Sequence, residues 1–172
     1  MNEVMKNILT RRSVRSFSDQ LVEKQIVEEI VRAALYAPSA MNRQTWKFTV
    51  VTNKEKINRL SQVIGKELGR SGYDMYQPTL LIIPSNDRET VWGREDNACA
   101  LENMFLAAHS YGVGSVWINQ LQGICDKPEV RRVLDELEIP QNHVVYGMAA
   151  MGYPSEPVGD EKARVGEVAY IE

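Results

Sequence analysis

The chain has 172 residues, of which 44% are hydrophobic and 25% charged, and its formal net charge at pH 7 is −3. This length and composition are typical of one globular domain with its own core. The negative charge argues against general nucleic-acid binding, which needs a basic face. No apolar run follows the basic N-terminal residues, and no apolar stretch is long enough for a bilayer. We therefore expect no secretory signal, no membrane partner and a cytoplasmic location.

Apolar periodicity and capping patterns predict five helices and four strands. The expected helices span residues Asn2–Thr10, Val22–Tyr36 (capped by Ser18 or Asp19), 54–68, Glu95–Tyr111 and Lys127–Leu137. The expected strands span Lys47–Thr52, Thr79–Pro84, Ser115–Ile118 and His143–Met151. The helix from Glu95 is apolar on nearly every side, which is typical of a helix at the centre of a fold or of a dimer interface. The strand from Thr79 is expected to be buried on both faces.

The first fifteen residues differ in charge from the rest of the chain. Their cations are Lys6, Arg11, Arg12 and Arg15, against the single acid Glu3. Residues 11–17 place three guanidinium groups and two serine hydroxyls within seven positions. The planar guanidinium group binds phosphate or carboxylate oxygens in pairs. Residues 11–17 are therefore either a solvated basic turn or a local site for an anion.

Other potential site residues have ordinary structural explanations. Cys99 and Cys125 lack the spacing of metal ligands, and His109 and His143 stand alone, so we expect no metal site. Gly112 and Gly114 follow a helix and lack the third glycine of a dinucleotide fingerprint. No side chain is proposed as a catalytic acid, base or nucleophile.

Four stretches, taken in order along the chain, resemble the FMN-dependent nitroreductase family in its short-chain branch. They are Arg11-Arg12-Ser13-Val14-Arg15-Ser16-Phe17, the loop from Ala37 to Trp46, the segment from Glu102 through Gly112-Val113-Gly114 to Ile118, and Gly152-Tyr153-Pro154 followed by Lys162-Ala163-Arg164. The resemblance implies an α+β fold with a mostly antiparallel central sheet flanked by helices. It also implies an intertwined homodimer with FMN at the interface. Residues 1–172 would form one domain, with residues 152–172 as an arm on the partner subunit.

The resemblance also assigns residues to the cofactor. Arg11, Arg12 and Ser13 match residues that hold the FMN phosphate and ribityl chain, and Lys162 and Arg164 match a second phosphate-binding pair. Arg15 matches the cation at the flavin pyrimidine edge. The opposite subunit would contribute Pro38, Ser39, Asn42 and Gln44. Asn119 and Gln120 fall where the family presents a backbone N–H to flavin N5, although the family often has an acidic residue and a glycine there.

The implied function is an NAD(P)H oxidoreductase, in which the nicotinamide reduces FMN and a nitroaromatic, quinone or similar acceptor reoxidises it. Two alternatives stay open. The protein could bind or sequester flavin with little turnover, or use reduced flavin for other chemistry such as flavin fragmentation or dehalogenation. It could also be a helical interaction protein that binds no FMN.

Overall fold

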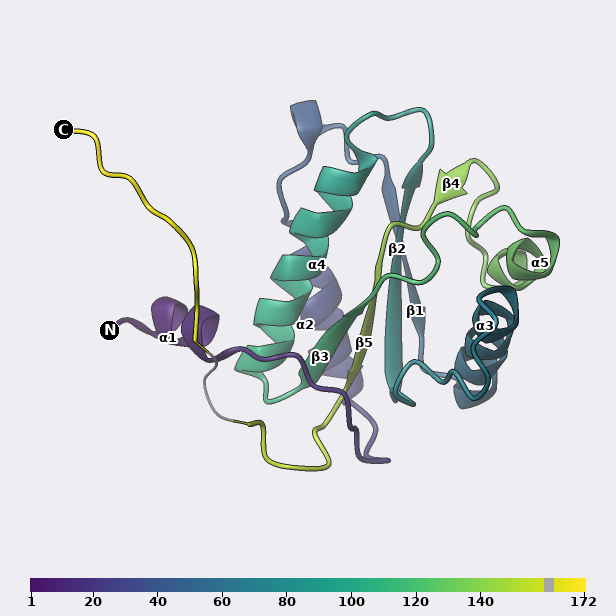
Figure 1. Cartoon of the computed structure of the whole chain (residues 1–172), viewed down its shortest axis with the longest axis horizontal. Coiled ribbons are helices and arrows are strands. Elements are labelled where there is room, and N and C mark those ends of the chain that lie inside the picture. Colours follow the sequence, from purple (N-terminus) through teal and green to yellow (C-terminus); the bar gives the residue numbers. More distant parts are fainter. Residues whose placement is uncertain (160–162) are drawn as a thin grey trace.

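The computed structural model describes residues 1–159 and 163–172 as helices packed on a central sheet (Figure 1). The strands are β1 (Trp46–Val51), β2 (Leu80–Asp87), β3 (Gly114–Ile118), β4 (His143–Val144) and β5 (Met148–Gly152). Their order is β1-β2-β5-β3, with β4 also pairing with β2, and each pair of these strands is antiparallel. The predicted α+β fold with a mostly antiparallel sheet is confirmed.

The helices lie on both faces of this sheet. They are α1 (Glu3–Thr10), α2 (Lys24–Leu35), α3 (Lys54–Glu67), α4 (Gly93–Ser110) and α5 (Pro128–Glu136), with a short 3-10 helix, η1, at Ala40–Asn42. Helices α2 and α4 cover one face, α3 and α5 cover the other, and α1 projects from the side of the molecule (Figure 1). Within residues 1–159 and 163–172, no helix combines the length and apolar content needed to cross a membrane.

Strand β2 separates two apolar cores. Leu80 and Ile82 face the core beneath α2 and α4, whereas Leu81 and Ile83 face the core beneath α3 and α5. All four side chains are fully buried, as the uninterrupted apolar run predicts. Alternate side chains of a strand point to opposite faces, so a strand with a core on each side needs apolar residues at every position.

Helix α4 is central, as its sequence predicts. Leu101 and Met104 are fully buried in the core that α4 shares with α2 and the sheet. The helix stops where Gly112 takes a left-handed backbone, at φ +73°. The N–H of the next residue, Val113, donates to the carbonyl of Ala108 at 2.9 Å, which satisfies a carbonyl at the helix end.

Two local expectations were wrong. Neither Ser18 nor Asp19 caps α2, which begins after Glu23 without a side-chain cap. Ser18 is instead held by its backbone, because its N–H donates to the Tyr153 carbonyl at 2.8 Å. The strand predicted for His143–Met151 is interrupted between β4 and β5. The Val145 N–H there donates to Cys125 Sγ at 3.4 Å rather than to a neighbouring strand.

Residues 13–18 form an extended segment beside the sheet. The Val14 N–H donates to the Ser115 carbonyl of β3 at 3.0 Å, and Ser13 and Ser115 form a parallel bridge. The approach is close enough to require glycine at position 114. A Cβ atom placed there would lie 2.8 Å from the Cβ of Val14. Gly114 therefore fixes how tightly the N-terminal segment lies against β3.

The substitution Gly114→Ala is expected to push residues 13–15 away from β3 and to destabilise the fold. Over-packing of this kind typically costs about 1–3 kcal/mol in the free energy of unfolding, measurable by urea denaturation followed by circular dichroism. Gly159→Ala is the matched control, because a Cβ there has no neighbour within 4 Å. Equal stability of the two variants would contradict the proposed close contact.

Candidate functional site

The extended segment and the C-terminal tail together line a cavity of about 520 Å³. Among the residues that the structure describes, four guanidinium groups line it, those of Arg11, Arg12, Arg15 and Arg164, against one carboxylate, that of Glu156. Among the described residues, none of these four arginines forms an ion pair. Like charges held this close repel one another, so the cavity has the electrostatic character of an anion-binding site.

Backbone pairing on both sides of the segment sets which side chains reach this cavity. In the extended segment Val14 is buried, whereas Ser13 and Arg15 are exposed on the cavity side. Further along, Ser155 donates its N–H to the Ser16 carbonyl at 3.1 Å, and Phe17 bridges to Pro154. The segment thus lies between β3 and the residues that follow β5, and these contacts hold Ser13 and Arg15 in place.

The two adjacent arginines have different surroundings. Arg12 turns back toward helix α1, where its NH1 donates to the carbonyls of Leu9 at 2.7 Å and Arg11 at 2.9 Å. Its Nε is buried and has no hydrogen-bond partner among the described residues. The guanidinium carbon of Arg11 lies 5.8 Å from the centre of the Phe105 ring. Arg11 therefore keeps its donors for a ligand, while Arg12 partly serves the end of α1.

His109 adds a titratable group beside these cations. Its Nε2 lies 2.9 Å from the hydroxyl of Thr10, and its side chain lines a smaller cavity together with Arg11 and Arg12. Burial, followed by the positive charges of Arg11 and Arg12, lowers the pKa of His109 below its ordinary value. The neutral imidazole is favoured because a further positive charge would be repelled.

The loop from Ala37 to Trp46 lies away from the cavity, at the opposite end of α4. The N–H of Ala40 donates to the carboxylate of Asp96, in the first turn of α4, at 2.9 Å. The loop is ordered by its own side chains, since Gln44 N–H donates to Ser39 Oγ at 3.2 Å and Gln44 Nε2 donates to Asn42 Oδ1 at 2.7 Å. Within one chain, this loop and the arginine cavity do not form one site.

Asn119 and Gln120 follow β3 at the end remote from Ser115. The Asn119 N–H donates to Oε1 of Gln120 at 3.0 Å, and the Asn119 side chain accepts from the indole of Trp117 at 3.3 Å. The Asn119 N–H is therefore already hydrogen-bonded to the Gln120 side chain. Among the described residues the Gln120 N–H makes no hydrogen bond, so it is the donor of this pair that could reach a ligand.

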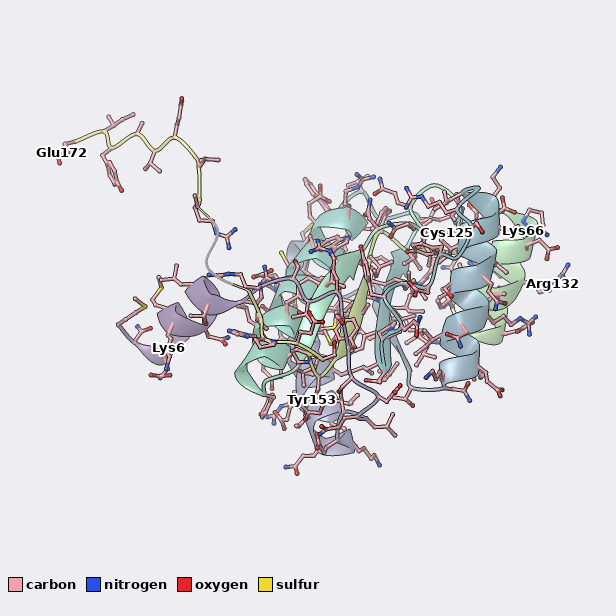
Figure 2. The ribbon with its side chains drawn as sticks, turned by 60° about the horizontal axis from the view of Figure 1, so that its bottom comes forward. Lys6, Lys66, Cys125, Arg132, Tyr153 and Glu172 are labelled. Carbon is pink, nitrogen blue, oxygen red and sulfur yellow. The ribbon has the colours of Figure 1, made fainter. Side chains whose placement is uncertain are left out.

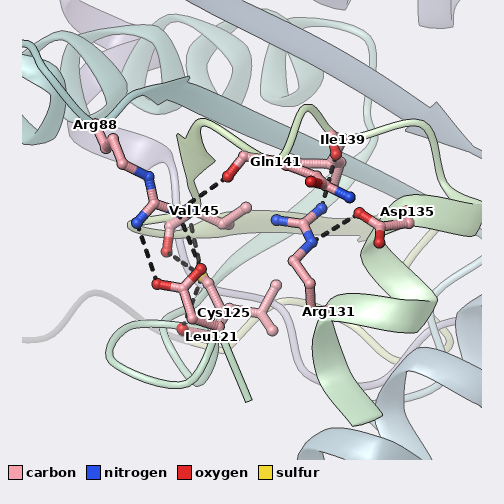
Figure 3. Close-up of polar contacts among 9 residues, drawn as sticks. Arg88, Leu121, Cys125, Arg131, Asp135, Ile139, Gln141 and Val145 are labelled. Carbon is pink, nitrogen blue, oxygen red and sulfur yellow. Dashed lines mark hydrogen bonds and ion pairs between the residues drawn. The ribbon is translucent and has the colours of Figure 1, made fainter. Parts of the chain in front are cut away.

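A polar network anchors the segment that follows Gln120 (Figure 3). Arg88 donates to the Asp126 carboxylate at 3.0 Å and to the Gln141 carbonyl at 3.0 Å. The hydrogen bond from Arg88 to Asp126 lowers the pKa of Asp126. Cys125 lies beside Asp126, where burial raises the pKa of its thiol. The buried thiol and the Arg88 contacts fix the far end of the segment that carries Asn119 and Gln120.

The predicted site residues thus fall into separate groups. One chain brings together Arg11, Arg12, Ser13, Arg15 and Arg164 at the cavity, whereas Pro38, Ser39, Asn42 and Gln44 lie at the other end of α4, and Asn119 and Gln120 at the far end of β3. Lys162 lies outside the described residues. From the sequence, Ser16 is counted among the hydroxyls of residues 11–17 but is assigned no contact with the cofactor. Sequence reasoning missed residues 156–159 of the cavity wall, and it treated His109 as a packing or surface residue.

The antiparallel sheet with helices on both faces agrees with comparisons to known proteins. The model of the nitroreductase family matches residues 8–153, and the chain belongs to this family. A crystal structure of a Bacteroides fragilis nitroreductase with bound FMN is 38% identical in sequence, with a TM-score of 0.94 and full coverage of both chains.

Two curated relatives cover most of this chain. A protein of Archaeoglobus fulgidus, provisionally named NADH dehydrogenase/NAD(P)H nitroreductase, is 36% identical over 162 residues, which are 91% of this chain and 88% of the relative. The FMN reductase (NADPH) of Bacillus subtilis is 26% identical over 189 aligned positions, covering 100% of this chain and 74% of the relative. The resemblance to the nitroreductase family is confirmed.

The pKa of His109 should report the arrival of a phosphate group in the cavity. The dianion would offset the charges of Arg11 and Arg12, so the protonated imidazole would be less disfavoured and the pKa of His109 should rise. An NMR titration of the two histidines, with and without FMN, measures this change. His143 is the internal control, because burial is the largest cause of its lowered pKa and Arg11 and Arg12 do not contribute. An unchanged His109 titration, or equal rises at both histidines, would contradict this location for the phosphate.

Proposed function

We propose that this protein is an FMN-dependent NAD(P)H oxidoreductase that delivers electrons to a nitroaromatic, quinone or similar acceptor by a ping-pong route. The observation that carries the proposal is the cavity in which guanidinium groups from both ends of one nitroreductase-family chain converge. Two comparisons support it: the Bacillus subtilis relative is named an FMN reductase, and the Bacteroides fragilis structure contains FMN.

The residues present fit a flavin mononucleotide. The cavity volume is in the range of cofactor pockets, roughly 300–1,000 Å³. Its wall offers guanidinium groups and the Ser13 and Ser16 hydroxyls, which match a phosphate and a polyhydroxylated chain. The Nε of Arg12 is buried and lacks a hydrogen-bond partner among the described residues, which leaves an unsatisfied positively charged donor beside this cavity.

The phosphate-binding role is assigned chiefly to Arg11 and Arg164, with Ser13 on the adjoining ribityl chain. The Arg11 guanidinium lies over the Phe105 ring, and this contact restricts the Arg11 side chain without using the hydrogen-bond donors of Arg11. Arg12 contributes mainly charge, because NH1 is bonded to the backbone. Lys162 is proposed for the same phosphate on the family resemblance alone.

Bound FMN would supply the capacity to accept a hydride from NAD(P)H and to return two electrons to an acceptor. Arg15 is proposed to stabilise the extra negative charge that the reduced ring carries at its pyrimidine edge. A charged hydrogen bond of this kind contributes about 1.5–3 kcal/mol. Because about 1.4 kcal/mol corresponds to about 30 mV for a two-electron couple, Arg15 would raise the reduction potential by several tens of millivolts.

The remaining contacts to the ring are assigned to two further segments. The Gln120 N–H, with Asn119 beside it, would donate toward N5. The loop that carries Pro38, Ser39, Asn42 and Gln44 would cover the ring from a second subunit, because in its own chain it lies at the far end of α4 from the cavity. The nicotinamide and the acceptor would occupy the same open face in turn, which removes the need for a separate nucleotide-binding fold.

A homodimer is supported by apolar surface that one chain leaves uncovered. Beyond Arg164, the tail of residues 165–172 runs away from the body as an extended chain whose side chains point into solvent (Figure 2). Its apolar side chains Val165, Val168, Tyr170 and Ile171 are between 73% and 96% exposed. The α1 residues Val4, Met5, Ile8 and Leu9 are exposed as well. Exposed apolar side chains in such numbers are typical of an interface.

The same chain also has an apolar groove that could receive the apolar side chains of a tail. A groove of about 660 Å³ runs between α2 and β1, and its apolar wall consists of Leu21, Val22, Val27, Val31, Leu35, Val50 and Leu80. Strand β1 is at the edge of the sheet, so its outer backbone groups can pair with another extended chain. We assign the tail of a second copy to this groove, where it would act as the arm implied for residues 152–172.

Replacing Val165, Val168, Tyr170 and Ile171 by serine should weaken the dimer at least about tenfold, since about 1.4 kcal/mol suffices for a tenfold change and each buried apolar side chain contributes more than that. Sedimentation velocity over a range of concentrations measures the effect. The control replaces Glu167 and Glu172 of the same segment by glutamine. A dimer of unchanged strength in the serine variant would show that the tail is not an interface element.

The function is tested by reconstituting the protein with FMN and mixing it rapidly with NADH or NADPH, while flavin absorbance is followed. Loss of absorbance, followed by recovery on adding a quinone or nitroaromatic compound, is the expected result. Arg11→Ala should weaken FMN binding by about 10- to 100-fold, the equivalent of one charged hydrogen bond. Arg132→Ala on α5 is the control, because it removes a cation on the opposite side of the molecule (Figure 2). Flavin that binds but is not reduced by either nicotinamide would refute the reductase proposal.

A further inference from the structure

Three consecutive residues before β2 have a left-handed backbone, although none is glycine. Met75, Tyr76 and Gln77 have φ angles of 53°, 67° and 52°. Side chains other than glycine are rarely found in this region, because the Cβ atom crowds the backbone. Strained residues of this kind persist only where surrounding contacts hold them, and they concentrate at functional sites.

The contacts that hold this turn come from Asp74 and from the core. The Asp74 carboxylate accepts from the Tyr76 N–H at 2.9 Å and from the Gln77 side-chain amide at 2.9 Å. The Asp74 carbonyl accepts from the Gln77 N–H at 3.0 Å. Met75 is 1% exposed and belongs to the core beneath α3 and α5. Asp74 therefore accepts the hydrogen bonds that hold the turn together, while Met75 attaches the turn to the core.

With Met75 directed inward, the next residue, Tyr76, is directed outward. Its side chain is 42% exposed, although an aromatic ring is normally better buried. The guanidinium carbon of Arg15 lies 6.0 Å from the centre of the Tyr76 ring. Among the described residues, the Arg15 guanidinium forms no hydrogen bond or ion pair, and the Tyr76 ring is its cation–π partner there. An arginine over an aromatic ring is held by cation–π attraction and stacking without losing its hydrogen-bond donors.

We propose that Tyr76 is a positioning residue for Arg15, held in place by the strained turn that Asp74 stabilises. The ring keeps the Arg15 guanidinium at the cavity edge, with its donors directed to a ligand rather than spread over many rotamers in solvent. This inference rests on the proposed function, because the ligand edge that Arg15 faces is the pyrimidine edge of FMN. It adds a determinant of the flavin reduction potential from a segment distant in sequence from the arginine stretch.

The expected effect is a selective loss of affinity for the reduced cofactor. In Tyr76→Ala, Arg15 becomes mobile, and the ratio of affinities for reduced and oxidised FMN should fall about fivefold, which lowers the midpoint potential by about 20 mV at 29.6 mV per tenfold change. The measurement is a spectroscopic redox titration of the bound flavin. Tyr76→Phe retains the ring and should keep the wild-type potential. Asp74→Ala, which releases the turn, should shift the potential in the same direction as Tyr76→Ala.

A double-mutant cycle separates this role from a general structural one. In an Arg15→Ala background, Tyr76→Ala should cause no further change in potential, because the residue through which Tyr76 acts is absent. Tyr76→Leu replaces Tyr76→Ala if the latter does not fold, since leucine keeps apolar bulk without an aromatic face. Additive shifts from Arg15→Ala and Tyr76→Ala would overturn the inference.

The outcomes also separate this inference from the proposed function. A wild-type protein that fails to bind FMN overturns both. A wild-type protein that binds FMN and is reduced by a nicotinamide, combined with a Tyr76→Ala variant of unchanged potential, overturns the positioning role alone. An equal shift in Tyr76→Phe and Tyr76→Ala also overturns it, because the hydroxyl rather than the ring would then be responsible.

Discussion

The candidate site depends on one constraint, which is that the mutually repelling guanidinium groups of Arg11, Arg12, Arg15 and Arg164 line the same cavity. The N-terminal segment that carries the first three arginines is held in place by backbone pairing with β3 on one side and with residues 153–155 on the other. Among the described residues no ion pair compensates these cations, so keeping them close is unfavourable and lowers the stability of the fold. An anionic ligand would recover that energy, so ligand binding and docking of the N-terminal segment are thermodynamically linked.

Much of the fold could be predicted from short-range patterns in the sequence. The apolar run from Leu80 to Ile83 predicts a strand with a core on each side, and the apolar helix from Glu95 predicts a central helix; both are observed. Errors arose where a distant contact decides a local conformation. Ser18 has the right chemistry for a helix cap, but its N–H donates to Tyr153, 135 positions away in the chain. No local pattern contains that pairing.

The candidate site shows the same division. The arginine stretch is recognisable because residue type alone gives its charge, and Arg164 could be added through the family resemblance. Arg12 turns back toward the end of α1, which leaves Arg11 as the better ligand donor. This difference depends on how the chain leaves α1 and packs beside Phe105, which no local pattern predicts. The proximity of Tyr76 to Arg15 and of His109 to Arg11 depends on tertiary packing, and neither residue carries a signal in the sequence.

The length of helix α4 determines which parts of the proposed cofactor site one chain can supply and which parts must come from its partner. Its 18 residues correspond to a length of about 27 Å at 1.5 Å per residue. The loop from Ala37 to Trp46 contacts one end of this helix, and the arginine cavity lies beyond the other end. In the proposed two-fold assembly, each cofactor would take its cations from one chain and its covering loop from the other. A chain defective in Arg11 and a chain defective in the loop, each inactive alone, would therefore form one intact composite site when mixed. Such intragenic complementation would make the two subunits genetically separable although their sequences are the same.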